Sequence, residues 1–257
     1  MIYLKTPAEI EKMRVSCQII GSLLDALATL IRSGVCTLEL DEFAEEFIRS
    51  RGGIPSFKGY QIPGLKPFPG SICASINAAI VHGIPRRETI LQEGDIIGID
   101  VGVLCNGYHG DAARSYRVGK VSSQAESLLQ VTEQALELGI AAAVEGNRIG
   151  DISNAIGSFV VSRGYFVADD LTGHGIGRNL HEEPQIPNFG KPGRGPRIAA
   201  GMTLAIEPMV NIGTNRVSEK GWEFCVADNS LSAHFEHTIL VTNGKPEVLT
   251  IAEENIL

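Results

Sequence analysis

Carboxylates stand inside apolar runs of this sequence, where an isolated charge is costly. Asp100 lies in IIGIDVGVL, Glu207 in LAIEPMV and Glu236 in AHFEHTI, and none of these runs contains a Lys or Arg. Asp111 follows in YHGDAARSY. A buried, ionised carboxylate without a partner carries an effective desolvation cost of several kcal/mol. Each acid must therefore be paired, hydrogen-bonded, protonated or bound to a metal.

An Asn-Gly pair predicts how two of these acids meet. Asn106–Gly107 favours a two-residue hairpin turn, which would place Asp111 opposite Gly102. Asp100 would then lie diagonal to Asp111 on one sheet face, roughly 7–8 Å away at the backbone. Gly102 would leave the space above Asp111 open, and a cation between the two carboxylates would relieve their repulsion. The alternative is an ion pair between Asp100 and an arginine such as Arg114, and the two aspartates alone do not decide between these.

Later segments supply further candidate ligands. His174 stands between glycines in TGHGIG, so no neighbouring side chain blocks its ring. Pro208 favours extended geometry at Glu207, and Glu236 is expected inside a third strand. Singly, each acid has a buried salt bridge as its alternative. Two Asp, two Glu and one His together suit Mn²⁺, Fe²⁺, Co²⁺ or Zn²⁺ better than a structural zinc site. The five exceed one tetrahedral ion and suit two ions ~3.5–4 Å apart.

The composition is that of an ordinary globular protein. The chain has 257 residues, 44% of them hydrophobic, with a formal net charge of −8 and no run of five Lys or Arg. These values disfavour a nucleic-acid or anionic-membrane partner. Five cysteines without a CxxC pair match neither a disulfide framework nor a zinc finger. With no signal-peptide pattern and no run of 18 apolar residues, we expect a soluble cytoplasmic protein that binds neither nucleic acid nor membrane.

Two similar halves are expected to position the candidate ligands. Thr6 and Glu9 form a capping box before a long amphipathic helix that ends at Gly34. The other expected elements are helices over 38–51, 123–144 and 152–163, strands between 71 and 117, irregular structure over 54–70, and strands and loops after 164, with 184–196 as a Pro/Gly-rich loop. This repeated order predicts a single α+β domain over 1–257, with pseudo-symmetric halves of about 1–120 and 121–257.

Together these segments resemble the type I methionine aminopeptidases, which are pita-bread metallopeptidases. The resemblance spans essentially the whole chain and is carried by GIPRRETILQEGDIIGIDVGVLCNGYHGD, GHGIGRNLHEEP, GMTLAIEPMV and LSAHFEHTILV. It implies a pseudo-two-fold fold with a curved, mostly antiparallel sheet covered by helices. It also implies hydrolytic removal of an N-terminal methionine when the second residue is small.

The resemblance implies a role for each candidate ligand. Asp111 and Glu236 would bridge two divalent ions, with Asp100 on one ion and His174 and Glu207 on the other. The nucleophile would be a water or hydroxide between the ions, since a metal lowers the pKa of bound water to ~7. Glu207 would take the proton of this nucleophile.

Other residues have counterparts in the family outside the ligand set. His181 would stabilise the tetrahedral intermediate, and His82 would contact the scissile amide and assist the leaving amine. Asn77 and Ser232 would help to hold a monovalent cation. The residues expected at the methionine pocket are Tyr60, Phe68, Cys73 and Trp222, with Phe57 as a further candidate and core filling as the alternative for each aromatic ring.

The resemblance gives no ligand role to the three remaining histidines. His109 and His237 lie close to ligands in the sequence, and we expect their rings to pack on the opposite face of their strands. His234 shares a face with Glu236, and its role stays open.

Two other functions are weighed against this one. A prolidase or Xaa-Pro aminopeptidase would share the fold, but such proteins usually carry a large N-terminal domain, and this chain begins at the catalytic module. A binding module without activity would have lost ligands, and all five are present. The leading hypothesis is a monomeric methionyl aminopeptidase that acts near the ribosome on the N-terminal methionine of nascent polypeptides. Because the sequence begins Met1–Ile2, we expect it to keep its own methionine.

Overall fold

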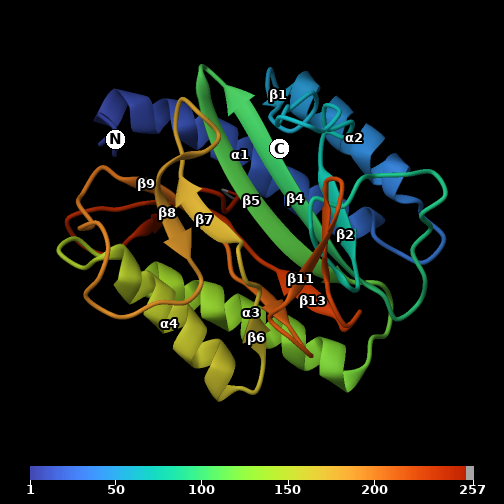
Figure 1. Cartoon of the computed structure of the whole chain (residues 1–257). Coiled ribbons are helices and arrows are strands. Elements are labelled where there is room, and N and C mark those ends of the chain that lie inside the picture. The colour runs from blue at the N-terminus through green and yellow to red at the C-terminus, as the bar shows by residue number, and fades with distance from the viewer. Residues whose placement is uncertain (253–257) are drawn as a thin grey trace.

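Two pairs of helices lie on opposite sides of a group of strands (Figure 1). The computed structural model describes residues 1–252. Its helices are α1 (Pro7–Leu30), α2 (Thr37–Ser50), α3 (Ser123–Ala142) and α4 (Ile149–Ser162). Each pair precedes a group of strands, in agreement with the repeated order expected from the sequence. The single domain with halves of about 1–120 and 121–257 stays a prediction.

Short polar motifs set the helix starts. The carboxylate of Glu9 accepts a 2.9 Å hydrogen bond from the backbone N–H of Thr6, so the predicted capping box is confirmed. Ser122 caps α3, one residue before the expected start. α4 begins at Ile149 rather than at 152, because Asp151 accepts a hydrogen bond from the backbone before it.

Among the described residues, α1 alone has the length and hydropathy to cross a membrane. Half of its apolar window is buried inside the fold. Leu23 and Leu27 of α1 pack in the same core as Ile99 and Val101. Burial of this kind is typical of the core helix of a globular protein.

The strands of the first half centre on a long hairpin. They are β1 (Ile54–Pro55), β2 (Cys73–Ile76), β3 (Ala79–Val81), β4 (Ile96–Cys105) and β5 (Tyr108–Arg117). β4 pairs with β1, β2 and β5, always antiparallel. Gly102 lies opposite Asp111 across an Asn106–Gly107 turn, so the predicted register is confirmed.

The strands of the second half are shorter. They are β6 (Phe166–Val167), β7 (Thr172–Gly175), β8 (Glu182–Pro187), β9 (Thr203–Ile206), β10 (Met209–Asn211), β11 (Val217–Lys220), β12 (Glu223–Val226), β13 (Ser232–His234), β14 (His237–Leu240) and β15 (Glu247–Val248). They form sheets in the orders β15-β14-β9-β7-β8 and β13-β10-β6, while β11 pairs with β12 and β12 pairs with β3.

Two strands that we expected to be continuous are interrupted. The segment 202–212 divides into β9 and β10 around Glu207–Pro208, and the segment 232–242 divides into β13 and β14 around Phe235–Glu236. β9 pairs with β14 in one sheet, and β10 pairs with β13 in another. The two segments therefore pass side by side from one sheet to the next, and each carries a glutamate at its break.

The expected loop over 184–196 is wrong in its first residues. β8 extends through Pro184 to Pro187 and, among the strands of residues 1–252, pairs with β7 alone. An edge strand tolerates proline because one side of its backbone needs no partner.

The segment around Glu236 meets the first hairpin along β5. The backbone N–H of Glu236 donates to the carbonyl of Ala113 at 2.8 Å, and Ala113 donates back at 3.3 Å. The hydroxyl of Thr238 donates to the carbonyl of Asp111 at 2.7 Å and accepts from its N–H at 3.0 Å. These bonds place the segment around Glu236 directly beside the hairpin that carries Asp111.

Candidate metal centre

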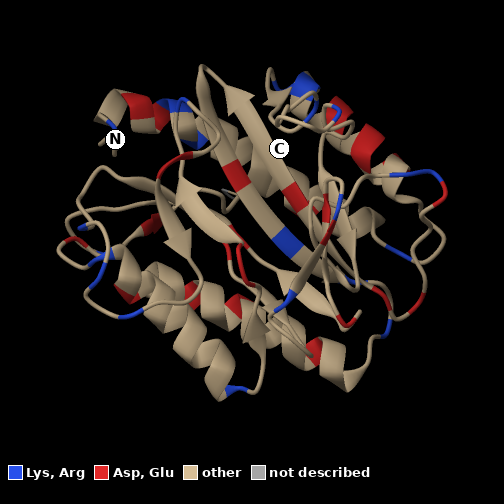
Figure 2. Ribbon diagram, in the orientation of Figure 1, with Lys and Arg blue, Asp and Glu red and all other residues tan. Residues whose placement is uncertain are grey.

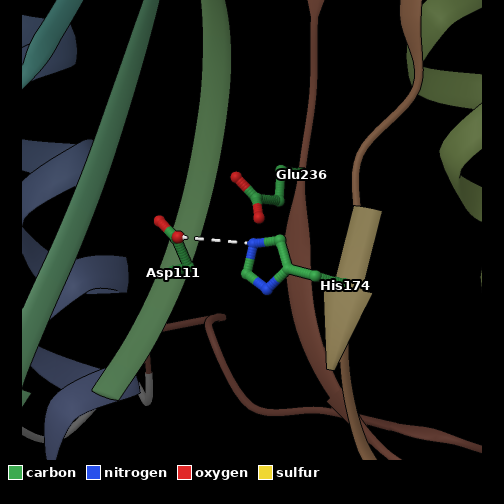
Figure 3. A group of neighbouring side chains, drawn as sticks. All are labelled: Asp111, His174 and Glu236. Carbon is green, nitrogen blue, oxygen red and sulfur yellow. Dashed lines mark ion pairs between the residues drawn. The ribbon is translucent and has the colours of Figure 1, made fainter. Parts of the chain in front are cut away.

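The five candidate ligands lie together, although they come from separate segments of the chain. Asp100 is on β4, Asp111 on β5 and His174 on β7, and Glu207 and Glu236 occupy the two strand breaks. Figure 3 shows Asp111, His174 and Glu236 pointing toward one another. The Nε2 atom of His174 lies 3.9 Å from Asp111 Oδ2 and 3.6 Å from Glu207 Oε1.

The imidazole of His174 is held in the form that binds metals. Its Nδ1 lies 2.8 Å from the carbonyl oxygen of Gly175, which can only accept a hydrogen bond. Nδ1 therefore carries the proton, and Nε2 presents its lone pair to the carboxylates. Burial lowers the pKa of His174 to about 3, which keeps the ring neutral.

Buried carboxylate oxygens in this cluster lack protein donors. With the carboxylates ionised, Asp100 Oδ1, Asp111 Oδ1 and Glu236 Oε1 have no hydrogen-bond partner among the described residues. Arg114 does not supply one, because its guanidinium pairs with Asp25 at 2.8 Å. The proposed ion pair between Asp100 and Arg114 is therefore wrong. Unsatisfied, buried carboxylate oxygens beside a free imidazole nitrogen fit divalent metal ions.

The carboxyls raise one another's pKa values. Burial raises the pKa of Glu207 to about 8 and that of Asp100 to about 7. Burial, followed by the charge of neighbouring carboxylates, raises the pKa values of Asp111 and Glu236 well above their usual range. Figure 2 shows acidic positions on the long central hairpin as well as on helices and loops. Divalent cations would offset this repulsion and favour the ionised forms.

Two overlapping groups could each hold an ion. In the first, ligand atoms of Asp111, His174 and Glu236 all lie within 4.8 Å of one another. In the second, the same holds for Glu207, His234 and Glu236. The sequence left the role of His234 open. Its position two residues before Glu236, in an apolar run, was the available signal.

His82 and His181 reach the same space from other elements. The His181 ring packs edge-on against that of His174 with centroids 4.5 Å apart, and its Nδ1 lies 3.0 Å from the hydroxyl of Tyr60. The His82 ring packs against Phe224 at 5.5 Å. Burial lowers the pKa of His82 to about 4 and also lowers that of His181. Both rings are therefore neutral near pH 7.

A cavity of about 600 Å³ connects these histidines, the five ligands and an apolar wall. The wall includes every residue expected at the methionine pocket, namely Phe57, Tyr60, Phe68, Cys73 and Trp222. The Phe68 and Trp222 rings pack edge-on at 5.4 Å. The indole N–H of Trp222 donates to the carbonyl of Lys66 at 2.8 Å, which ties the irregular segment before Phe68 to the cavity.

We expected the space beside Gly102 to be open, and this expectation is wrong. A Cβ atom at Gly102 would meet Phe57 Cε1 at 2.8 Å and Ser56 Cβ at 2.9 Å. The aromatic ring therefore fills the room that the missing side chain leaves. The absence of a side chain at Gly102 therefore allows Phe57 to take its place in the apolar wall of the cavity.

Sequence reasoning missed part of the cavity wall. Val81, Leu180, Met209 and Phe224 also line it. Leu180 and Phe224 had a usable signal, because Leu180 directly precedes His181 and Phe224 lies two residues from Trp222 near the start of β12. Val81 and Met209 had none, since an apolar residue in a strand usually fills a core.

The remaining histidines make local contacts. His237 Nδ1 lies 2.8 Å from Thr250 Oγ1, and His109 Nδ1 lies 2.9 Å from Ser56 Oγ. The expected orientation of His109 is wrong, because a residue two positions before Asp111 lies on the same strand face as Asp111. On that face, the hydroxyl of Ser56 lies within hydrogen-bond distance of the His109 ring.

Asn77 and Ser232, the residues expected near a monovalent cation, lie side by side. The N–H of Ser232 donates to the carbonyl of Asn77 at 2.8 Å. The side-chain amide of Asn77 already bonds to Asp95 and to the backbone of Ile96. The Ser232 hydroxyl donates to the carbonyl of Val210 at 3.3 Å, which leaves the lone pairs of its oxygen for a cation.

Comparison with known proteins agrees with this geometry. A profile of the family described as Metallopeptidase family M24 matches residues 11–243. The chain is 47% identical to a methionine aminopeptidase of Clostridium acetobutylicum, over 98% of this chain and 100% of that protein. It is 46% identical to methionine aminopeptidase 1 of Bacillus subtilis, over 97% and 99% of the two chains.

Solved structures agree as well. A crystal structure of a methionine aminopeptidase from Thermotoga maritima matches with a TM-score of 0.95 and 42% identity, covering 98% of this chain and 100% of that one. A prolidase of Pyrococcus horikoshii matches with a TM-score of 0.78 and 20% identity, and the chain covers 65% of it. At 20% identity, the second likeness shows the fold alone. The two matches confirm the expected α+β pita-bread fold. Prolidases share this fold only as distant relatives.

Proposed function

The chain belongs to metallopeptidase family M24 and, within it, to the methionine aminopeptidases, and from this premise we propose how its residues remove an N-terminal methionine. The convergence of the five ligands in the lining of one cavity, beside an apolar wall, carries the proposal. Hydrolysis of a peptide bond needs a nucleophile, a polarised carbonyl and a protonated leaving amine. The cavity has a side chain suited to each need.

The protein uses divalent metal ions, and we propose two of them. Asp111 and Glu236 would bridge the ions, because each is buried beside ligands from both halves of the chain. Asp100 would complete one site, and His174 and Glu207 the other. When bound, such ions lower the pKa of a water molecule to ~7 and polarise the scissile carbonyl. Mn²⁺, Fe²⁺, Co²⁺ and Zn²⁺ all suit this ligand set.

Glu207 is proposed as the proton carrier. Its carboxylate lines the cavity beside His174, and a carboxylate in such a position can accept a proton and pass it on. The Oε1 atom faces His174 and the first ligand group, whereas Oε2 faces away from it toward His234. We assign the transient proton to the Glu207 carboxylate, which then passes it to the leaving amine.

His82 and His181 are proposed to act on the scissile amide. Both are neutral rings that line the cavity and can donate one hydrogen bond each. His181, beside His174, would donate to the carbonyl oxygen as negative charge develops there. His82, beside the aromatic wall, would contact the amide nitrogen.

The aromatic wall is proposed to bind the methionine side chain. A thioether packs well against ring edges, and Phe68 and Trp222 meet edge-on in this wall. Tyr60 and Cys73 would complete the pocket.

The cellular setting extends the same proposal. The substrates are peptides that begin with methionine, and we propose that nascent chains at the ribosome supply them in the cytoplasm. The enzyme is proposed to act as a monomer. A monovalent cation held by Asn77 and Ser232 would stiffen the junction of β10, β13 and the segment before β4.

The test is turnover of metal-free enzyme titrated anaerobically with Mn²⁺, Fe²⁺, Co²⁺ or Zn²⁺. We expect activity to rise with up to two equivalents of metal on a Met-Ala-Ser peptide, with far less on Met-Leu-Ser and none on Ala-Pro-Ser. Saturation at one equivalent would reject the two-ion assignment. Cleavage of Ala-Pro-Ser at a comparable rate would reject the proposed pocket.

A further inference from the structure

His234 is a buried polar side chain at the metal centre for which the proposed mechanism has no role. The residue is 3% exposed. Its Nε2 atom lies 3.5 Å from Glu207 Oε2 and has no hydrogen-bond partner among the described residues. A buried donor or acceptor left without a partner destabilises the folded state. Such an atom, directed at the proposed proton carrier, calls for a function.

The position of the ring is fixed by backbone bonds on both sides. The N–H of His234 donates to Ser115 Oγ at 3.0 Å, and its carbonyl accepts from the same hydroxyl at 2.9 Å. On the other side, β13 pairs with β10, where Met209 is the partner of His234. Glu207 lies two residues before Met209, in the break that leads into β10, so this strand pairing brings the imidazole close to the carboxylate.

The surroundings of His174 and His234 differ in a way that separates ligand from donor. His174 Nε2 lies within 4.0 Å of two carboxylates from different strands, as expected for a ligand to a shared ion. Among the described residues, His234 Nε2 lies within 4.0 Å of one carboxylate oxygen only, Glu207 Oε2. The two rings thus take opposite oxygens of the same carboxylate.

We propose that His234 is a positioning residue for Glu207, whose Nε2–H donates to Oε2 and directs Oε1 at the metal. This inference rests on the proposed role of Glu207. A carboxylate oxygen has two lone pairs, so Oε2 can accept this bond and still take a proton on its other side. The 3.5 Å separation is expected to shorten in the loaded enzyme, as catalytic hydrogen bonds often do.

Partners of metal ligands commonly change metal affinity when they are removed, by 10–100-fold. His234→Phe keeps a ring of similar width and deletes the donor, whereas His234→Gln keeps an N–H donor without an imidazole. His237→Phe is the matched control, because His237 is a partly buried histidine of the adjoining strand whose Nδ1 faces Thr250. Thermal unfolding of each variant establishes that it is folded before binding is measured.

The experiment measures Co²⁺ binding to metal-free enzyme by calorimetry, the visible absorption of the Co²⁺-loaded forms, and kcat and KM on Met-Ala-Ser. For His234→Phe we expect Co²⁺ affinity ~10–100-fold weaker, kcat reduced more than KM is raised, and an unchanged Co²⁺ band at saturation. His234→Gln should restore affinity and kcat to within about threefold, while His237→Phe matches the wild type.

Two results would overturn the role of His234. Wild-type affinity and kcat in His234→Phe would show that the contact does nothing. A Co²⁺ band altered in both His234→Phe and His234→Gln would make His234 a direct ligand instead. Neither result touches the proposed function, which fails separately if the wild-type enzyme binds no Co²⁺ and leaves Met-Ala-Ser intact.

Discussion

Asp100 and Asp111 stand on an unbroken ten-residue hairpin, whereas Glu207 and Glu236 stand where two paired strands are interrupted. On the hairpin, one turn sets the register, and alternation then decides which side chains share a face. At the interruptions, alternation fails, and the direction of each glutamate depends on how two distant strands change sheets together.

The difference explains how one site combines rigidity with adjustable ligands. The hairpin residues are held by ladder hydrogen bonds on the strand and by Thr238 across it. Pro208 has no N–H, so the backbone after Glu207 forms fewer ladder bonds. Side-chain contacts such as that of His234 must then orient the glutamate.

Removing one ligand from each region is the strongest test of this comparison. Asp111→Asn and Glu236→Gln should each lower kcat/KM on Met-Ala-Ser by roughly 10³-fold or more, or ~4 kcal/mol of transition-state stabilisation, because both are proposed to bridge the ions. Asp25→Asn, at an exposed ion pair with Arg114, is the control. If Glu236→Gln kept its activity within tenfold of the wild type, the glutamate at this strand break would not be a bridging ligand.

The metal-free enzyme should lose stability as the pH rises. Burial raises the pKa of Asp100 from 3.8 to about 7 and that of Glu207 from 4.5 to about 8. The folded state therefore holds protons that the unfolded chain has released, and stability falls with pH between those values. We expect a loss of several kcal/mol between pH 4.5 and 8, seen as a fall in Tm of roughly 10 °C or more for a chain of this size.

Differential scanning calorimetry of metal-free and metal-loaded enzyme across this pH range measures the effect. The loaded form should show a flatter curve, since bound cations favour the ionised carboxylates. Asp100→Asn and Glu207→Gln would show how much of the slope comes from the hairpin and how much from the break. A metal-free enzyme that gains stability over the range would contradict the burial of unpaired carboxyls.

Gly102→Ala tests the packing of the hairpin against the cavity wall. The new methyl would lie 2.8 Å from Phe57 Cε1, and overpacking of this kind costs ~1–3 kcal/mol. Urea unfolding should show that loss, with a raised KM as Phe57 moves. Gly98→Ala is the matched control on β4, because its Cβ would meet nothing closer than 3.5 Å. Equal effects at the two glycines would contradict the packing argument.

The smallest expected effect concerns the turn that sets the hairpin register. Asn106 has a φ of 53°, a conformation that costs most residues ~1–2 kcal/mol. Asn106→Ala should therefore destabilise the protein by ~1 kcal/mol in urea unfolding and leave kcat/KM unchanged, whereas Asn106→Gly should stay close to the wild type. A large fall in activity would mean that the turn, rather than the ladder, positions the aspartates.

Local signals in the sequence determined the first region almost completely. The Asn106–Gly107 turn and strict alternation placed Asp111 opposite Gly102, and polar caps located the starts of α1 and α3 to within a residue. The same signals marked His174 and both glutamates as candidates. Each of these inferences uses neighbours along the chain or across one tight turn, which a sequence displays directly.

Tertiary structure alone decided the second region. The breaks at Glu207 and Glu236, the strand over 182–187 and the filling of the Gly102 gap by Phe57 all depend on segments far apart in the chain. The placement of His234 beside Glu207 likewise follows from the pairing of β10 with β13. Alternation in a sequence predicts faces only while a strand stays in one sheet, and here two strands leave their sheets together at the residues proposed to bind the metal.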